Sequence, residues 1–372
     1  MHEMAARWFW DHCQAVELLV LALAAPAVLY RGWRWWTGRP SLALAASAIF
    51  AVSIWPWALC DIEPIWAALS PEAQAFHAAG GIGVVASASA WVLVVEACGQ
   101  ADRSIRRKKI QRLVAGATIT FVAVAALTVS TVSTPGGSDF FTYLTEPRRD
   151  SLSLLAATLI GHIFAAAVLA HLALLAMRRM DHTPAGQGLG LLGAAGGAVA
   201  IAVVTRGICA ELFQWNGYSP PAWCGLTVQT SAITAGAVLA ISALTWPPTA
   251  LRRQVRHTLR RLQPLREALI ELFPGLAPPR QFRVGLTAVP PEWIGQIQDG
   301  LSLLAQYRDL PREACSPPEN RTKHIQAVID WIHGQSPLGM STVWLHAPPQ
   351  LTNTEWIQAL ADAFMPRRHP VQ

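Results

Sequence analysis

Residues 223–262 read WCGLTVQTSAITAGAVLAISALTWPPTALRRQVRHTLRRL, and this stretch decides the fold. The run from Trp223 to Trp246 is almost wholly apolar, and ~20 such residues suffice for a helix to cross a bilayer. Pro247 and Pro248 end the run, and five arginines follow between residues 252 and 261. A span followed by clustered arginines predicts that the chain emerges on the cytoplasmic side. We therefore expect a membrane domain at residues 1–250 and a second domain at residues 251–372.

The composition also favours a membrane protein. Of the 372 residues, 52% are hydrophobic and only 14% are charged, whereas soluble domains carry about 25% charged residues. The net charge of +6 comes mostly from short basic runs beside the apolar blocks. That pattern is typical of membrane topology and of contact with anionic lipid, not of nucleic-acid binding. We therefore expect membrane lipid as a partner and no nucleic acid.

Seven apolar segments are predicted to cross the membrane. Backbone groups inside hydrocarbon must form their hydrogen bonds within the segment, so each segment is expected to be a helix. The acidic residues Glu3, Asp11 and Glu17 do not fit a cleaved signal peptide, so the first segment is expected to be retained. The seven segments are 14–30, 42–60, 76–98, 113–132, 152–177, 188–213 and 223–246.

Basic residues alternate between the loops and predict the orientation. The loops after the first, third and fifth segments hold clusters of arginine and lysine, whereas the other three loops hold only Arg148 and Arg149. Basic loops stay in the cytoplasm. The prediction is a multi-pass protein of the cell membrane with its N-terminus outside and its C-terminus in the cytoplasm.

Residues 251–372 are predicted to form a small helical cytosolic domain, so the expected fold class is all-α throughout. Leucines at helical spacing between residues 251 and 273 predict a helix that Phe273-Pro274-Gly275 stops. Further helices are expected at 291–304, 321–333 and 353–364, the last capped by Thr352 or Asn353. No strand-like alternation occurs. A domain of this kind can dock a cytosolic protein partner.

Two short motifs in this region carry a family resemblance. They are LQPLREAL at residues 262–269, with FP at 273–274, and IQDGL at 297–301, with Leu304 and Tyr307 behind it. Together with the seven-segment layout, they make the chain resemble actinobacterial seven-helix membrane proteins described as transporters, which carry a C-terminal cytosolic domain of unknown function. The chain departs from that pattern at Arg266, where an aromatic residue is usual, and at Gln298, where arginine is frequent. The resemblance implies a transporter and supplies no catalytic residues.

A polar pocket open to the outside is predicted within the membrane domain. An ionisable side chain at the centre of a span costs ~2.5–3.5 kcal/mol, so each one marks a candidate functional site. Side chains from five helices share the outer level of the membrane, although residues so near a helix end can also extend their polar groups to water. The predicted pocket residues are Glu17, Asp61, Glu63, His77, Arg206, Glu211 and Gln229.

Arg206 lies deepest of these residues and is expected to have an acidic partner, either Glu17 or Glu211. Glu211 is five residues further along, about 140° around an α-helix, which is poor geometry for a pair on one helix. His162 and His171 fall on opposite faces of their helix and are each expected to be satisfied by a neighbouring helix. We therefore predict no metal, cofactor or catalytic site.

Cysteines and glycines in the membrane domain predict further structural features, namely a candidate disulfide and close packing of helices. Cys209 and Cys224 either form a disulfide that ties their loop or are separate small buried residues. Glycines four apart, at 186 and 190 and at 193 and 197, predict close packing of the sixth segment against a neighbour.

Two functional classes fit this layout. The resemblance favours a transporter for a small molecule, although neither an inverted repeat nor a broken pair of helices is evident in the sequence. The alternative is a seven-helix receptor, because the last span runs directly into the cytosolic domain and can pass on a signal from an outer ligand. A membrane enzyme acting on a lipid ranks third, with Glu17 and His77 as the one candidate acid/base pair.

Overall fold

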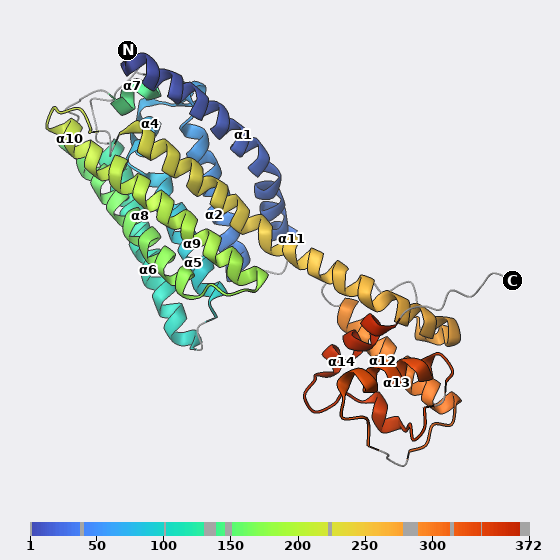
Figure 1. Ribbon diagram of the computed structural model, residues 1–372. Helices are drawn as coiled ribbons and strands as arrows, with labels where there is room; N and C mark the ends of the chain where they lie inside the picture. The colour runs from blue at the N-terminus through green and yellow to red at the C-terminus, as the bar shows by residue number, and fades with distance from the viewer. Residues whose placement is uncertain are drawn as a thin grey trace. The chain divides into compact units, whose positions relative to one another are not determined.

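The computed structural model describes residues 2–37, 41–99, 102–129, 139–145, 151–221, 225–277, 289–312, 316–335 and 337–364 (Figure 1). Every regular element within these ranges is a helix and none is a strand, as the all-α prediction requires. The chain divides into two compact units, Met1–Pro248 and Thr249–Gln372. This division falls two residues before the predicted boundary.

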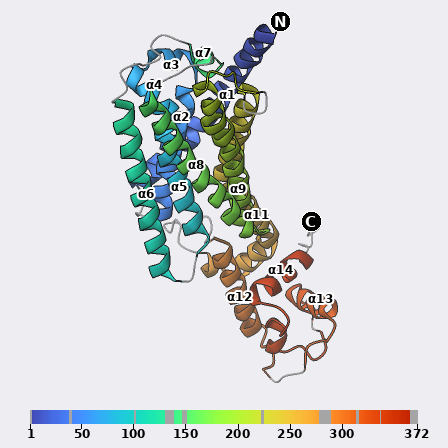
Figure 2. The same cartoon turned by 90° about the vertical axis from the view of Figure 1, so that its left-hand side faces the viewer.

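The N-terminal unit is a bundle of long helices joined by short ones. Figures 1 and 2 show the short helices α4 and α7 at the end of the bundle where the chain begins. The elements are α1 (His2–Thr37), α2 (Leu42–Cys60), α3 (Glu63–Ala68), α4 (Pro71–Ala78), α5 (Gly81–Ala97), α6 (Arg103–Val129), α7 (Phe140–Thr145), α8 (Leu152–Arg178), α9 (Pro184–Ala202), the π-helix η1 (Val203–Ala210), α10 (Glu211–Trp215) and α11 (Leu226–Leu272).

Among the described residues, six helical stretches are long and apolar enough to cross a membrane. They are α1, α2, α6, α8, the stretch from α9 through η1 to α10, and α11. α4 and α5 make a seventh if they count as one span. The chain is therefore an integral membrane protein with several transmembrane helices.

The predicted third segment, residues 76–98, is not one continuous helix. α4 and α5 meet at an angle of 42°. The break falls at Ala79 and Gly80, and Gly80 adopts a left-handed conformation with φ of 74° that side chains other than glycine rarely accept. No broken helix is evident from the sequence, and the break at Gly80 corrects that expectation.

The prolines at 247 and 248 do not interrupt the helix that carries the last predicted span. α11 continues through them, and through Pro264, to Leu272. Proline removes the backbone donor that would bond to the carbonyl four residues earlier. For Pro248 that carbonyl belongs to Leu244, and Arg31 of α1 donates to it from Nη2 over 3.1 Å. A side chain thus replaces the lost backbone bond, and Phe273-Pro274 stops the helix as predicted.

Small residues bring α8 and α9 close together. A methyl group added at Gly193 would lie 2.9 Å from the Cβ of Ala176, and one added at Gly196 would lie 2.8 Å from Leu172. At Gly197 the nearest atom is 4.0 Å away, so the packing pair is 193 and 196. Gly186 and Gly190 face the turn before their own helix instead. The predicted packing role therefore holds for Gly193 but not for all four glycines.

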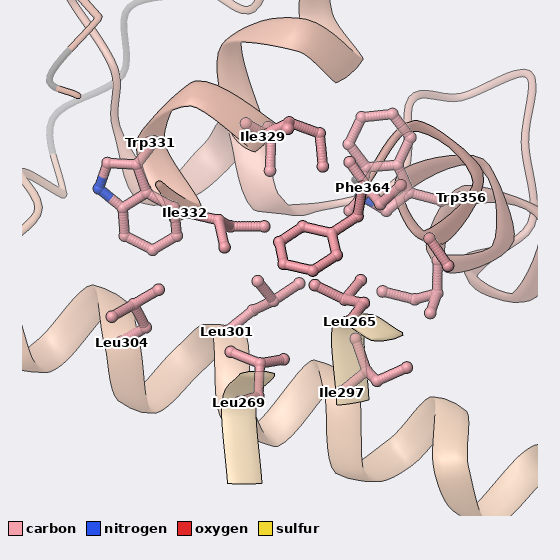
Figure 3. Close-up of a cluster of buried hydrophobic side chains, with 14 of the residues drawn as sticks. Leu265, Leu269, Ile297, Leu301, Leu304, Ile329, Trp331, Ile332, Trp356 and Phe364 are labelled. Carbon is pink, nitrogen blue, oxygen red and sulfur yellow. The ribbon is translucent and has the colours of Figure 1, made fainter. Parts of the chain in front are cut away.

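The C-terminal unit has its own hydrophobic core. Its elements are the end of α11, the 3₁₀ turns η3 (Pro274–Leu276) and η4 (Thr342–Leu345), and the helices α12 (Val289–Tyr307), α13 (Arg321–Ile332) and α14 (Asn353–Ala363). Figure 3 shows the side chains of these helices converging on one another. The core includes Leu262, Leu265, Leu269, Ile297, Leu301, Leu304, Val328, Trp356, Ile357 and Leu360.

The two short motifs LQPLREAL and IQDGL supply this core directly. LQPLREAL contributes three leucines that are at most 1% exposed, and IQDGL contributes Ile297 and Leu301. Arg266, which departs from the family pattern, lies 4.5 Å over the ring of Trp293 and so still packs on an aromatic face. Thr352 caps α14 in a reciprocal arrangement with Glu355, which selects the first of the two predicted caps.

His324 makes the stability of the C-terminal unit depend on pH. The residue is 2% exposed, its Nε2 lies 2.8 Å from the carbonyl oxygen of Trp344, and its ring packs on Trp356. Burial lowers the pKa of His324 because the charged ring is poorly solvated there. Below about pH 6.5 the unfolded chain therefore binds more protons than the folded unit, and acidification favours unfolding.

We expect the unfolding free energy of residues 249–372, expressed alone, to fall between about pH 6.5 and pH 5, with at most ~1.4 kcal/mol per pH unit from His324. His324→Gln keeps an N–H donor and is expected to flatten this part of the dependence. Urea unfolding followed by tryptophan fluorescence at each pH measures the effect. His346→Gln, at an exposed histidine of the same unit, is the matched control. Equal pH slopes for His324→Gln and the unsubstituted unit would contradict this account.

Candidate functional site

Five of the seven predicted pocket residues lie around one cavity in the N-terminal unit. Its water-accessible volume is about 70 Å³. A buried water needs about 10–15 Å³ of such volume, so the cavity has room for about five waters or for a ligand of similar size. The five residues are Asp61, His77, Arg206, Glu211 and Gln229.

Asp61 and His77 form the first hydrogen-bonding pair of the cavity. Asp61 follows the last turn of α2, and its Oδ1 lies 2.7 Å from Nε2 of His77 on α4. The side chains are 16% and 5% exposed, respectively. Gln14 of α1 fixes this turn, because its amide donates to the carbonyl of Asp61 over 2.9 Å and accepts from the backbone N–H of Glu63. The structure thus pairs His77 with Asp61 and not with Glu17.

Arg206 and Glu211 form the second pair, and a π-helix makes it possible. Nη1 of Arg206 donates to Oε1 of Glu211 over 2.9 Å and to Oε1 of Gln214 over 3.2 Å. The π-helix η1 bonds residue i to residue i+5, so residues five apart come to one face. The sequence analysis assumed α-helical geometry, in which the two side chains diverge by about 140°. The pair therefore forms within one helix, and Glu17 is not the partner.

Three polar atoms at the cavity have no hydrogen-bond partner within the described part of the chain. They are Nε of Arg206, Nδ1 of His77 and Oε1 of Gln229. All three are shielded from bulk solvent, and buried polar atoms nearly always have a partner in a folded protein or its bound water. The cavity is therefore a place where waters or a ligand must supply both a hydrogen-bond acceptor and a donor.

His162 of α8 stands between two irregular points of the backbone. A methyl group added at Gly207, in the π-helix, would overlap its ring, and one added at Gly80, at the break between α4 and α5, would lie 3.3 Å from it. The ring also lines the cavity, and its Nδ1 lies 2.8 Å from the carbonyl of Thr158 in its own helix. The sequence analysis placed His162 in a helix but gave no signal for this position, which depends on two helix interruptions.

Glu17 and Glu63 do not line the cavity. Glu63 accepts hydrogen bonds from Nε1 of Trp10, at 3.0 Å, and from the backbone N–H of Phe141, at 3.3 Å. It therefore ties α1 and α7 to α3 beside the cavity. Glu17 is half-buried on α1 and also lies outside the lining.

An aromatic layer adjoins the cavity at α7. Phe140 and Tyr143 of α7 line it, and both rings pack on Trp66 of α3, with centroids 4.5 and 5.1 Å away. Leu144 also lines the cavity, and its carbonyl accepts from Nε2 of Gln214 over 3.2 Å. The short helix α7 is thus bonded to the element that carries Glu211.

A second cavity continues from the first into the bundle. It also has a water-accessible volume of about 70 Å³, and its walls are apolar and rich in small residues. Trp57, Asp61, Val199 and Ile233 line both cavities. Asp61 therefore stands at the junction between a polar cavity and an apolar one.

The remaining predictions concern histidine, cysteine and metal. His171 accepts from Nε1 of Trp91 on α5 over 3.0 Å, so a neighbouring helix satisfies it as predicted. Cys209 is a free thiol, and Cys224 lies outside the described residues, as does the disulfide proposed between them. No cluster of three or more His, Cys, Asp or Glu side chains suited to a metal ion occurs in the described ranges.

The chain matches no model of a known protein family, no characterised protein and no solved structure. Its function therefore has to be argued from the two cavities and the helices around them.

Proposed function

We propose that this membrane protein is a transporter for a small polar molecule that binds in the cavity between His77 and Arg206. The observation that carries the proposal is the meeting of two interrupted helices at His162. The break between α4 and α5 and the π-helix η1 both lie against its ring. Many transporters bind their substrates at discontinuous helices, because backbone N–H and C=O groups that are not bonded within the helix are available there to the substrate.

The unpartnered atoms define the ligand chemistry. Nε of Arg206 requires a hydrogen-bond acceptor on the ligand, and Oε1 of Gln229 requires a hydrogen-bond donor on the same ligand. Both acidic residues of the cavity already face a basic one, so the site does not call for a ligand of high net charge. A small neutral or zwitterionic molecule with a hydroxyl, amide or carboxyl group fits these conditions.

We also propose the orientation. α4 and α5 count as one span, which gives seven, and the basic residues of alternate loops support an N-terminus outside and a cytosolic unit at Thr249–Gln372. In this orientation the polar cavity opens toward the outside and the apolar cavity lies nearer the bilayer centre. A ligand entering from outside meets the hydrogen-bonding groups first.

One observation favours a receptor as the second candidate. α11 is a single helix of 47 residues. Gln229 and Ile233, near its start, line the polar cavity, and Leu265 and Leu269, near its end, lie in the core of the C-terminal unit. One helix therefore carries both cavity residues and core residues of the second unit, which is a route for a signal.

Gln229→Leu tests the proposal with little risk to folding. It removes a buried acceptor that has no partner in the described residues, so we expect an unchanged or slightly higher unfolding temperature. A cavity that binds its ligand through this acceptor is expected to lose transport. Thr227→Leu, a polar-to-leucine change at an exposed position of the same helix, is the matched control.

The measurement compares cells that lack the gene with cells that carry the wild-type, Gln229→Leu or Thr227→Leu protein at equal membrane levels. The small molecules of cells and medium are profiled, and any compound whose gradient depends on the wild-type gene is then followed in liposomes containing purified protein. Wild-type flux restored by Gln229→Leu would rule out ligand binding through this acceptor, and the absence of any gradient that depends on the wild-type gene would sink the transporter proposal. Altered transcripts with unaltered gradients would support the receptor instead.

A further inference from the structure

A crevice with a basic end lies between α5, α6 and α8, away from the cavities described above. Its water-accessible volume is about 600 Å³. That size falls in the ~300–1,000 Å³ range of sites that bury a small molecule or a lipid chain. Residues 109, 112, 113 and 116 of α6 follow the i, i+3, i+4, i+7 spacing of one helix face, which turns toward residues 164, 167, 168, 171 and 175 of α8.

Two cations at this crevice are not neutralised by any described residue. Lys109 and Arg112 line it, are exposed, and have no acidic partner in the described ranges. Arg106, one turn earlier, differs because its Nε lies 3.3 Å from Oε1 of Glu96. The free charge at the crevice is therefore +2, and it suits an anionic group.

His171 adds a neutral donor beside the cations. Its Nδ1 accepts from Nε1 of Trp91 over 3.0 Å, so in the neutral ring the proton sits on Nε2. His171 is exposed and lines the crevice, so this Nε2–H is available to an ester or phosphate oxygen.

The crevice crosses from head-group depth to hydrocarbon depth. The ten residues Arg103–Arg112 of α6 contain six basic residues, whereas the 17 residues from Leu113 to Val129 carry no charge. Those 17 residues span about 26 Å at 1.5 Å each, close to the ~30 Å of a bilayer core. Lys109 and Arg112 therefore lie at the level of lipid head groups.

The walls below that level are apolar. Leu113 and Gly116 of α6, Phe164 and Val168 of α8, and Val95 of α5 line the crevice. Gly116 leaves space there, because a methyl group added to it would come no closer than 3.7 Å to Phe164. An acyl chain that enters the crevice thus meets only apolar side chains.

We infer that this crevice is a binding site for one phospholipid with an anionic head group. The phosphate lies on Lys109 and Arg112, the glycerol ester region faces His171, and an acyl chain fills the space along Gly116 and Phe164. Basic pockets between membrane helices recognise anionic head groups in this way. The site is independent of the proposed transport cavity.

The test uses purified full-length protein stripped of lipid in a neutral detergent. Phosphatidylglycerol is expected to bind and to raise the unfolding temperature, whereas phosphatidylcholine with the same acyl chains is expected to do neither. Lys109→Ala/Arg112→Ala is expected to weaken phosphatidylglycerol binding roughly 30-fold, because the loss of each cation weakens it about fivefold and the two factors multiply. Arg107→Ala/Lys108→Ala removes two charges of the same helix that do not line the crevice, and is expected to bind as the wild type.

Two further arms separate a lipid from other anions. Glycerol phosphate, the head group without chains, is expected to produce no shift, and an equal shift from it would overturn the lipid assignment. Ala167→Phe fills the crevice from an exposed position of α8 without changing charge and is expected to abolish binding. Native mass spectrometry counts the bound lipids. Retention of one phosphatidylglycerol by Lys109→Ala/Arg112→Ala, or equal loss in Arg107→Ala/Lys108→Ala, would also overturn the proposal.

Discussion

Replacing Arg206 with alanine is expected to lower the unfolding temperature of the purified full-length protein by roughly 10 °C. The change removes a cationic partner at 2.9 Å from the carboxylate of Glu211, which is 12% exposed. Removal of one member of a buried ion pair costs ~3–5 kcal/mol because the other charge stays buried. In a protein of this size each kcal/mol corresponds to ~2–4 °C. Unfolding in detergent, followed by intrinsic fluorescence, measures the loss.

The second-site variants identify the partner. Arg206→Ala combined with Glu211→Gln replaces the buried carboxylate by a neutral amide and is expected to recover most of the loss. Arg206→Ala combined with Glu17→Gln is expected to recover none, because Glu17 does not line the cavity. An Arg206→Ala protein as stable as the wild type would show that water solvates both side chains and that the pair contributes little. Rescue by Glu17→Gln alone would contradict the observed pairing.

The predicted depth of a residue in the membrane indicated which residues line the cavity better than it indicated which of them pair with one another. Asp61, His77, Arg206, Glu211 and Gln229 were grouped from their level along seven apolar segments, and all five line one cavity. Glu17 and Glu63 share that level but do not line the cavity, because a level does not specify which face of a helix a residue occupies. Hydropathy along the chain reports burial in lipid and carries little information on direction within the bundle.

Backbone irregularity accounts for the other differences. The Arg206–Glu211 pair, the break at Gly80 and the position of His162 all depend on departures from α-helical geometry. A glycine within an apolar run is equally compatible with a straight helix, a bend or close packing, so the sequence alone does not distinguish them. The same limit applies to Pro248, whose effect on α11 is offset by the side chain of Arg31, which lies 213 residues before Leu244, the residue whose carbonyl it bonds.

The C-terminal unit was predictable to a greater extent, for a physical reason. Its helices are amphipathic, with leucines repeating on one face, so periodicity indicates both the helix and its buried side. Spacing alone placed five leucines on one stripe, at 259, 262, 265, 269 and 272. Leu262, Leu265 and Leu269 are in the core, whereas Leu272, in the last turn of the helix, is 53% exposed. In a membrane helix both faces are apolar, so the sequence pattern no longer distinguishes the side buried in the protein from the side that faces lipid.

Gly161→Ala is expected to destabilise the N-terminal unit by about 2–3 kcal/mol, in the range of overpacked cores. The added methyl group would overlap the backbone carbonyl oxygen of Ala79, at the break between α4 and α5. A backbone atom cannot move aside as a flexible side chain does, so α8 or the break itself must shift. The neighbouring residue, His162, lines the cavity, and we expect transport to fall along with stability.

Gly197→Ala is the matched control, because it makes the same substitution in a membrane helix where the nearest atom, on Ala173, is 4.0 Å away. Alanine is favoured over glycine in a helix by up to ~1 kcal/mol, so this variant is expected to be as stable as the wild type or slightly more stable. Unfolding temperatures in detergent, measured side by side, are therefore expected to move in opposite directions. A Gly161→Ala protein that matches Gly197→Ala in stability would mean that α8 does not pack against the break between α4 and α5. The break would then not lie against His162, and it would not shape the cavity.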